Sequence, residues 1–519
     1  MPSSLTEPAA TARGPSSHRV ARNSGLYFLS LALPALAALF LVPVTVRSLG
    51  PARFGLLALA WAVAESAGMF DLGLARTTVR FVADAFARGG DRLREIVLGS
   101  VVSQLIFGLV AGVVLFAAAP VLAQDVFKIP ASAAGEATAM FRALAFQIPV
   151  LLAAAALRAT LEGAQRFDLS TALRIPGSLA SVAIPAFASA AGFSLPAIVW
   201  QLFTVRLALL LLSAVVVSRT LLPGSWALPK GLRTIRELFG YSGWVAVSTA
   251  LGPALGSAER FITGAVVGIA GLGYYTGAAE GATRFLMIPA TAFAALLPAL
   301  AHTEASARRE RALAATGAAR RQLAALLFPL CLTLFIFAPD ILSLWLGPAF
   351  GVAAGDALRI LSVGVFLGGL AHLPLALLYG AGRPDLPAKI HLAEVVVYLP
   401  FVYLLVKGWG ITGAGLAWAT RCAADLVLYE WACARSLGRA AVTPDETARR
   451  RRLAVAASVP LVVFPASAWI APAAPVIAAV AFAAAFAAYA YIVWSGVLTP
   501  AERSAWLGML PRRLGREHA

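Results

Sequence analysis

The chain has 519 residues, of which 60% are hydrophobic and 13% charged, and its formal net charge at pH 7 is +17. A water-soluble domain carries about 25% charged and about 45–50% apolar residues, so this composition excludes a soluble globular protein. The apolar excess is spread over the whole length, which also excludes a soluble protein with a single membrane anchor. A bilayer core about 30 Å thick needs a run of roughly 20 apolar residues for each spanning helix. The composition therefore predicts an all-α membrane protein with many spans.

Apolar runs separated by glycine, proline and charged residues predict about fourteen spanning helices. In chain order they lie near 24–46, 54–71, 95–119, 137–158, 174–191, 196–218, 241–264, 274–298, 322–346, 356–380, 388–406, 411–433, 453–471 and 475–496. The connecting loops are too short to fold as separate domains. Residues 1–22 are rich in Ser, Pro, Thr and Arg, so we expect them to be disordered, and no cleavable signal peptide follows them.

Predicted loops with many Lys and Arg residues alternate along the chain with loops that have few. If the N-terminus lies inside, the inner segments contain 32 of the 42 lysines and arginines. Lys and Arg collect in cytoplasmic loops of membrane proteins, so this asymmetry predicts an even number of spans with both termini in the cytoplasm. The same asymmetry accounts for the high net charge, and we expect no nucleic-acid partner.

No catalytic motif is recognisable along the chain. We find no Gly-x-Ser-x-Gly elbow, no phosphate-binding glycine loop and no metal-type His/Cys spacing. His372 and His391 are isolated helical histidines, more typical of packing or a pore than of a metal site. The three cysteines lie in apolar stretches, so no disulfide framework is expected. The sequence predicts a protein that is not an enzyme, with no cofactor, metal or catalytic residue.

The chain repeats itself weakly at an offset of 218 residues. Gly50 aligns with Gly268 and Gly55 with Gly273, and Ser24-Gly25 aligns with Ser242-Gly243. Internal repeats of this kind are typical of transporters built from two related bundles. We therefore predict two pseudo-symmetric six-helix lobes and an appended helix pair, divided as a disordered cytoplasmic N-terminus 1–22, an N-lobe 23–230, a C-lobe 231–440, a helix pair 441–500 and a basic cytoplasmic tail 501–519.

Several short motifs occur in an order that resembles a known family. They are Ser48–Gly55 (SLGPARFG), Phe70–Leu74 (FDLGL), Gly268–Tyr275 (GIAGLGYY), Ile288-Pro289 to Leu297-Pro298, Leu344–Pro348 (LWLGP), Ala381–Pro384 (AGRP) and Gly410–Trp418 (GITGAGLAW). This order, over roughly residues 20–440, resembles the polysaccharide-exporter branch of the multidrug/oligosaccharidyl-lipid/polysaccharide (MOP) superfamily, the Wzx-like lipid-linked oligosaccharide flippases.

The resemblance implies a fold and a function. It implies two six-helix lobes that face each other across a central cavity and work by alternating access. The substrate would be a polyprenyl-pyrophosphate-linked oligosaccharide, as in O-antigen (lipopolysaccharide), capsule or exopolysaccharide synthesis. It would move from the cytoplasmic to the outer leaflet of the bacterial inner membrane. Membrane lipids, a polysaccharide polymerase and glycosyltransferases are the other partners that the resemblance implies.

Ionisable residues within the predicted spans are candidates for the substrate site, because a charge at mid-bilayer costs several kcal/mol and usually marks a pathway. Arginine suits a pyrophosphate because its planar guanidinium binds phosphate oxygens bidentately and stays charged. Salt bridges between helices remain the alternative for each residue. The candidates for substrate binding are Arg284, Arg260, Arg206, Arg142, Glu280 and Glu65, and further intramembrane charges are Glu259, Glu394, Arg421 and Asp425. For Arg421 and Asp425, four residues apart, we favour a structural pair.

Three other functions are compatible with many spans. A cation-coupled multidrug or small-molecule exporter of the same superfamily typically carries a carboxylate in its first span, but residues 24–46 contain none. A major-facilitator transporter would carry a Gly-x-x-x-Asp-Arg-x-Gly-Arg-Arg loop after its second span, and this chain does not. A membrane glycosyltransferase or ligase would need a large outer loop with acidic or histidine catalysts, and no predicted outer loop is long enough.

The predicted topology is testable with single cysteines and a membrane-impermeant thiol reagent. We expect Trp226→Cys to be labelled only from the cytoplasmic side and Phe193→Cys only from the outside, because the basic loops stay in the cytoplasm. The native cysteines lie in apolar helical stretches and serve as the unlabelled background. The reverse pattern at either position would contradict the topology.

Overall fold

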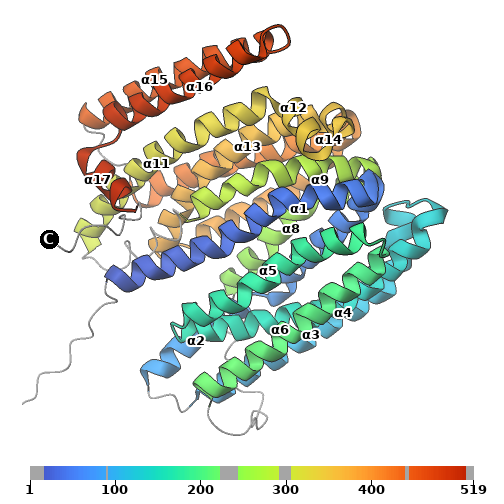
Figure 1. Ribbon diagram of the computed structural model, residues 1–519. Helices are drawn as coiled ribbons and strands as arrows, with labels where there is room; N and C mark the ends of the chain where they lie inside the picture. The colour runs from blue at the N-terminus through green and yellow to red at the C-terminus, as the bar shows by residue number, and fades with distance from the viewer. Residues whose placement is uncertain (1–16, 89–91, 223–242, 292–304, 439–443, 510–519) are drawn as a thin grey trace, which may run out of the picture.

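The computed structural model describes residues 17–88, 92–222, 243–291, 305–438 and 444–509. Within these residues every regular element is a helix, and the helices form two bundles with an added pair at one edge (Figure 1). The predicted all-α fold is confirmed. The predicted lobe boundary at 230/231 and the start of the helix pair at 441 lie outside the described residues, as do Ser242, Leu297 and Pro298. Of the segment 1–22, residues 1–16 also lie outside them, and the first helix begins at Ser17.

The N-lobe contains the helices drawn from blue to green in Figure 1. Short 3-10 or π turns follow the first and third of them. The elements are α1 (Ser17–Ser66), η1 (Ala67–Asp71), α2 (Leu74–Ala87), α3 (Leu93–Val121), η2 (Leu122–Val126), α4 (Ala131–Gly163), α5 (Phe167–Ala190) and α6 (Leu195–Leu221).

The C-lobe follows the same plan and is followed by the appended helices. Its elements are α8 (Gly243–Val266), α9 (Ile269–Thr283), η3 (Arg284–Leu286), α11 (Ala305–Ile336), α12 (Ala338–Leu346), α13 (Pro348–Gly380) and α14 (Asp385–Ser436). The appended elements are α15 (Pro444–Ile470), α16 (Pro475–Ile492), η4 (Val493–Val497) and α17 (Pro500–Met509).

The number of spans agrees with the sequence prediction. Among the described residues, 10 segments are long and apolar enough to cross a membrane. Two of them are double: α1 is kinked at Gly50 and α14 at Trp409 and Gly410, so each contains two predicted spans. The helices α8 and α9 correspond to the seventh and eighth predicted spans and are not among these 10 segments. With the two double segments and these two helices, the number of spans is consistent with the predicted fourteen.

The backbone confirms the 218-residue repeat at its two glycine turns. Gly50 has φ 71° and ψ 169°, and Gly268 has φ 92° and ψ 171°. Residues other than glycine rarely adopt a positive φ of this kind, so glycine is needed where each lobe reverses direction between two spans. The glycine turns are therefore the same structural feature in both lobes.

The two lobes touch through the equivalent glycines Gly55 and Gly273. A Cβ atom on Gly55 would overlap the backbone oxygen of Ile269, and a Cβ on Gly273 would overlap the backbone oxygen of Pro51. Pro51 and Ile269 are themselves 218 residues apart, so the contact is reciprocal, as a pseudo-twofold axis requires. Around it one continuous apolar core includes side chains of both lobes, among them Phe54 and Leu272.

The C-terminal helices α15 and α16 lie side by side at the edge of the C-lobe, next to α11 (Figure 1). Arg321 of α11 is only 3% exposed and forms ion pairs with Glu446 of α15 and Glu502 of α17. The hydroxyl of Tyr489 donates a hydrogen bond to the backbone oxygen of Ala325, at 2.7 Å. Because a buried guanidinium is costly without partners, these contacts fix the appended helices to the C-lobe.

The close contact between Gly55 and Gly273 predicts that a larger side chain at either position destabilises the protein. Gly55→Ala and Gly273→Ala should each lower the thermal unfolding temperature in detergent, because overpacking costs about 1–3 kcal/mol and here the obstacle is backbone. Gly317→Ala in α11 is the matched control, since a Cβ there meets nothing within 4 Å. Because Gly317 lies in an open helical position, Gly317→Ala should leave the unfolding temperature unchanged or raise it. If all three variants unfold at the same temperature, the lobes do not meet at these glycines.

Candidate functional site

A polar cavity of about 370 Å³ lies between the lobes. The N-lobe contributes α1, α4, α5 and α6, and the C-lobe contributes α9 and η3. The cavity is lined by Ser30, Leu31, Pro34, Val42, Trp61, Ala64, Glu65, Leu151, Arg174, Ser178, Ser181, Val182, Arg206, Glu280 and Arg284. Four of the six predicted site residues, Glu65, Arg206, Glu280 and Arg284, are in this lining.

A chain of alternating charges crosses from one lobe to the other at this cavity. Nη1 of Arg260 donates a hydrogen bond to Oε2 of Glu65 at 2.9 Å, and Nη2 of Arg260 lies 3.8 Å from Oε1 of Glu280. Glu280 also pairs with Arg284, one helical turn further on. Arg260 is thus held between two carboxylates and is 13% exposed, whereas Arg284 is 39% exposed and lines the cavity.

Arg206 is oriented by neutral groups. One guanidinium nitrogen donates to Oε1 of Gln147, and Nη2 lies 3.4 Å from the hydroxyl of Ser181. Nε2 of Gln147 is in turn fixed by donating to the backbone oxygen of Val199 at 2.8 Å. Within the part of the chain that the structure describes, Arg206 forms no ion pair, so its positive charge is not cancelled by a carboxylate.

The cavity region carries an excess of positive charge. Among the described residues at the cavity, the three guanidinium groups of Arg206, Arg260 and Arg284 outnumber the two carboxylates of Glu65 and Glu280. A site of this composition favours an anionic ligand, and guanidinium groups on different helices can bind phosphate oxygens from several directions.

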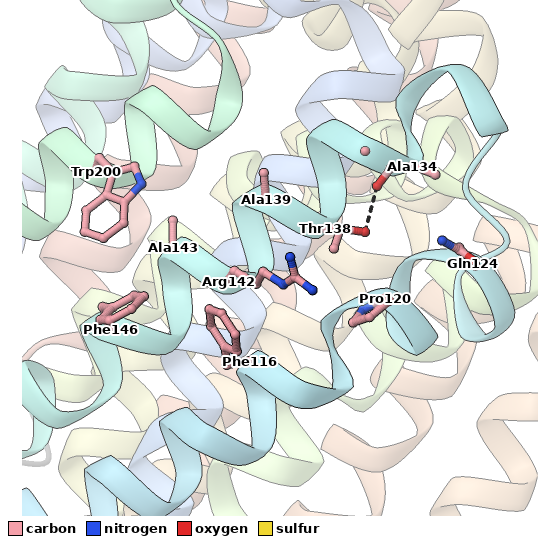
Figure 2. A pocket seen from close by; sticks show the side chains of 11 residues that line it. Phe116, Pro120, Gln124, Ala134, Thr138, Ala139, Arg142, Ala143, Phe146 and Trp200 are labelled. Carbon is pink, nitrogen blue, oxygen red and sulfur yellow. Dashed lines mark hydrogen bonds between the residues drawn. The ribbon is translucent and has the colours of Figure 1, made fainter.

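Arg142 lies elsewhere. It is exposed on α4, in a separate pocket of about 520 Å³ formed by α3, η2, α4 and α6 (Figure 2). The reason is the rotation of α4: neighbouring positions such as Phe141 and Ala143 are buried, and Arg142 points to the opposite face. The structure does not bring Arg142 together with the other five predicted site residues.

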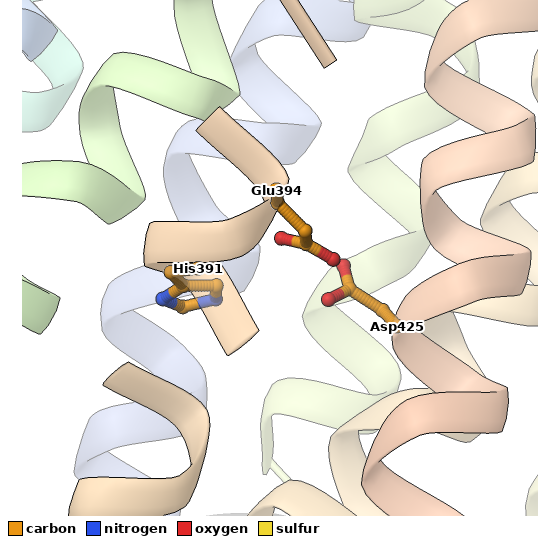
Figure 3. Close-up of side chains that lie close together, drawn as sticks. All are labelled: His391, Glu394 and Asp425. Carbon is orange, nitrogen blue, oxygen red and sulfur yellow. The ribbon is translucent and has the colours of Figure 1, made fainter. Parts of the chain in front are cut away.

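A second polar cluster lies inside the C-lobe, where the two halves of α14 face each other. Ligand atoms of His391, Glu394 and Asp425 lie within 4.8 Å of one another, and the two carboxyl groups point toward each other (Figure 3). Both oxygens of Glu394, Nδ1 of His391 and Oδ1 of Asp425 are enclosed and have no hydrogen-bond partner among the described residues. Nε2 of His391 lies 2.9 Å from the hydroxyl of Tyr429.

Carboxyl groups outnumber cations around this cluster. Nε of Arg421 lies 3.8 Å from Oδ2 of Asp425, and its guanidinium lies over the ring of Tyr398, 5.5 Å from the centroid. The Tyr398 hydroxyl donates to Glu259, which is 1% exposed. Such a group could hold a metal ion, but the guanidinium already supplies a positive charge there. A buried carboxylate without a counter-charge costs several kcal/mol, so Arg421 stabilises this cluster.

An apolar cavity of about 610 Å³ adjoins the polar one. The two share Val42, Glu280 and Arg284. The rest of its lining is mostly apolar and comes from α1, α9, η3, α11, α12 and α13, including Leu36, Leu39, Phe40, Pro43, Phe285, Leu334, Leu344 and Trp345. The indole of Trp345 donates to the backbone oxygen of Leu39 at 2.7 Å, which links α12 to α1 beside this cavity.

Sequence reasoning missed several lining residues. Arg174, Ser178 and Ser181 occupy positions i, i+4 and i+7 of α5, which is one face of a helix. That spacing indicates a polar helix face that could line a cavity. In the sequence, however, Arg174 can equally be assigned to a cytoplasmic loop. Gln147, which orients Arg206, is a neutral polar residue and gave no signal.

The fold and the cavity together define a class of protein: a polytopic membrane transporter built from two pseudo-symmetric helical lobes. The chain belongs to the polysaccharide biosynthesis protein family, whose model matches residues 44–355. The family and the fold place it among the transporters and flippases of the MOP superfamily, which are not enzymes.

Known proteins resemble the chain over most of its length. A protein of Shigella flexneri described as a "Putative O-antigen transporter" is 27% identical over 417 residues, which is 79% of this chain and 97% of that protein. The lipid II flippase MurJ in an inward closed conformation has a TM-score of 0.69 at 9% identity, over 91% of this chain and 98% of that one. An outward-facing multidrug resistance MATE family transporter of the MOP superfamily has a TM-score of 0.57 at 18% identity, over 82% and 96%. At these identities the two structures show the shared fold.

The charge imbalance in the C-lobe predicts unequal losses of stability for two substitutions. Arg421→Met should destabilise the protein by about 3–5 kcal/mol, because it removes the cation from a buried cluster of carboxyl groups. Glu394→Gln should cost less than about 1 kcal/mol, because it removes a carboxyl that lacks a counter-charge. Thermal or denaturant unfolding in detergent at pH 7 measures both. Equal destabilisation by the two variants would show that Glu394 is an ionised partner of Arg421.

Proposed function

We propose that the chain is a flippase for polyprenyl-pyrophosphate-linked oligosaccharides. The observation that carries this proposal is the junction of two unlike cavities at Arg284. Among the described residues the polar cavity has an excess of positive charge, and the adjoining cavity is mostly apolar apart from Arg47, Glu280 and Arg284. A lipid-linked oligosaccharide has the same sequence of chemistries: a polar glycan, an anionic pyrophosphate and a long apolar chain.

The cavities differ in what they can hold. In the polar cavity, Ser178 and Ser181 line the wall and present hydroxyl groups to a glycan. In the apolar cavity, side chains such as Leu39 and Phe40 offer a surface to a polyprenyl chain. The pyrophosphate then lies at the junction next to Arg284, whose guanidinium has one carboxylate neighbour and is partly exposed.

The arginines have different roles in this proposal. Arg284 and Arg206 contact the pyrophosphate, since both line the cavity. Arg260 is held by Glu65 and Glu280, so it mainly sets the positions of these two carboxylates. Several moderate cationic sites suit transport better than one deep site, because a substrate that is bound too tightly is not released.

The glycine contact supports alternating access. Gly55 and Gly273 close the lobes on the side of the glycine turns, and Glu65 lies ten residues further along α1, about 15 Å away. The cavity is thus on the other side of the contact, toward the end of the helices where α1 begins. Export requires the lobes to separate at the glycines and to close at the opposite end.

Orientation and partners complete the proposal. With both termini in the cytoplasm of a bacterial cell, the cavity in this conformation lies on the cytoplasmic side of the inner membrane, where the glycan is assembled. The Shigella flexneri relative is described as an O-antigen transporter, and MurJ as a lipid II flippase. Glycosyltransferases that supply the substrate and a polymerase that uses it are the expected partners. The positive cavity disfavours cationic drugs as substrates.

Arg284 provides the main test. Arg284→Ala should reduce glycan export at least tenfold in a strain that lacks its own transporter, because it removes the cation at the junction of the cavities. Arg284→Lys should restore part of the activity, since it keeps the charge but loses the bidentate geometry. Export is measured as surface glycan, with the amount of protein in the membrane as the measure of folding.

Arg359→Ala is the matched control, because Arg359 of α13 is 40% exposed and pairs with Asp356 outside the cavity. It should export normally. If Arg284→Ala, Arg260→Ala and Arg206→Ala each retained full export, the cationic cavity would not be the pyrophosphate site.

A further inference from the structure

The pocket around Arg142 has no place in the proposed export path. The Arg142 guanidinium lies over the ring of Phe116, 5.1 Å from its centroid, and its side chain is exposed (Figure 2). In the part of the chain that the structure describes, Arg142 forms no ion pair. A cation inside the bilayer is costly without an anion. The described residues that line this pocket include no carboxylate.

The depth of Arg142 follows from its position in α4. This end of the N-lobe is marked by Glu136, which accepts hydrogen bonds from Arg53 and from the backbone nitrogen of Leu195 at 3.0 Å. Arg142 lies six residues further along α4, about 9 Å deeper. It is therefore close to the boundary between headgroups and acyl chains, on the side of the glycine turns.

An apolar groove of about 130 Å³ continues from this pocket along α3 and α4. Phe116 and Phe146 line both the pocket and the groove. The groove ends at Pro149, seven residues beyond Arg142 and about 10 Å closer to the bilayer centre. A Cβ on Gly112 would lie only 2.6 Å from the backbone oxygen of Ala145, so this glycine lets α3 and α4 approach closely at the floor of the groove.

The rim of the pocket is amphipathic. Gln124 and Thr138 are polar lining residues, and both lie on the side of the Arg142 guanidinium that is away from Phe146 and Trp200 (Figure 2). Trp200 of α6 stacks against Phe146, with ring centroids 5.4 Å apart, and is 43% exposed. Tryptophan is enriched at the membrane interface, where its ring contacts acyl chains and its N–H meets the headgroups.

We propose that this face of the N-lobe binds one anionic glycerophospholipid. Its phosphate pairs with Arg142, its headgroup hydroxyls contact Gln124 and Thr138, and one acyl chain lies in the groove between α3 and α4. The occupant is chosen by charge complementarity: an uncompensated cation at headgroup depth lies above an apolar groove that runs toward the bilayer centre.

The test measures binding of phosphatidylglycerol to the full-length protein in detergent, by native mass spectrometry. The wild type should bind one lipid more tightly than all others. Arg142→Ala should weaken this first binding about tenfold, the effect of losing one charge-assisted contact. Arg142→Lys should remain within about threefold of wild type, because it keeps the charge. Val113→Trp, which fills the groove from its exposed side, should weaken binding without touching the charge.

Lys407→Ala is the matched control. Lys407 is an exposed cation over an aromatic ring, with its Nζ 6.0 Å from the centroid of Tyr403, close to the α14 kink at Gly410. It lines neither the Arg142 pocket nor the groove, so its loss should leave the first binding unchanged. If Arg142→Ala and Lys407→Ala weakened the first lipid binding equally, the proposed site would be wrong. The same would follow if Arg142→Ala or Val113→Trp bound the lipid with wild-type affinity. Polyprenyl phosphate binding at least tenfold more tightly than phosphatidylglycerol would overturn the proposed occupant.

Discussion

The arrangement of the protein depends on one close approach of backbone to backbone. At Gly55 and Gly273 the two lobes meet with no side chain between them. Because the contact is reciprocal, it sets the lobes in a twofold relation and places the second half of α1 beside α9. This pairing brings Glu65 within reach of Arg260 and, through it, of Glu280 and Arg284. A larger residue at either glycine would change the spacing of the charges as well as the packing.

Two groups of charged residues meet at α8: the positively charged region of the interlobe cavity and the cluster of carboxyl groups in the C-lobe. Arg260 belongs to the interlobe chain, whose two guanidinium groups and two carboxylates lie beside Arg206, which forms no ion pair among the described residues. The preceding residue, Glu259, belongs to the C-lobe cluster, where the described carboxyl groups outnumber Arg421. Consecutive helical residues point about 100° apart, so one turn of α8 can serve both. The two regions therefore differ in the charge they favour: the cavity region favours an anionic ligand, whereas the carboxyl cluster favours a cation such as Arg421.

The fold alone does not distinguish among transporters of this superfamily, because similar folds occur in drug exporters and in lipid II flippases at identities below 20%. The proposed function rests instead on the chemistry of the cavities. An apolar cavity that shares Arg284 with a cationic one suits a substrate with a lipid tail and a phosphate. The Arg142 pocket repeats this chemistry on a smaller scale at the outer face of the N-lobe, where its neighbours are membrane lipids.

The sequence by itself determined the membrane class, the approximate number of spans and the repeat, because these depend on composition and on local periodicity. It also indicated the Arg421–Asp425 pair, since residues four apart share a helix face. Tertiary structure alone decided which arginines face the cavity. Arg142 and Arg206 look alike in sequence, but the rotation of α4 and α6 within the bundle turns one outward and the other inward. It also brought His391 and Glu394 to Asp425 across the α14 kink, since contacts between distant segments depend on packing rather than on helix period.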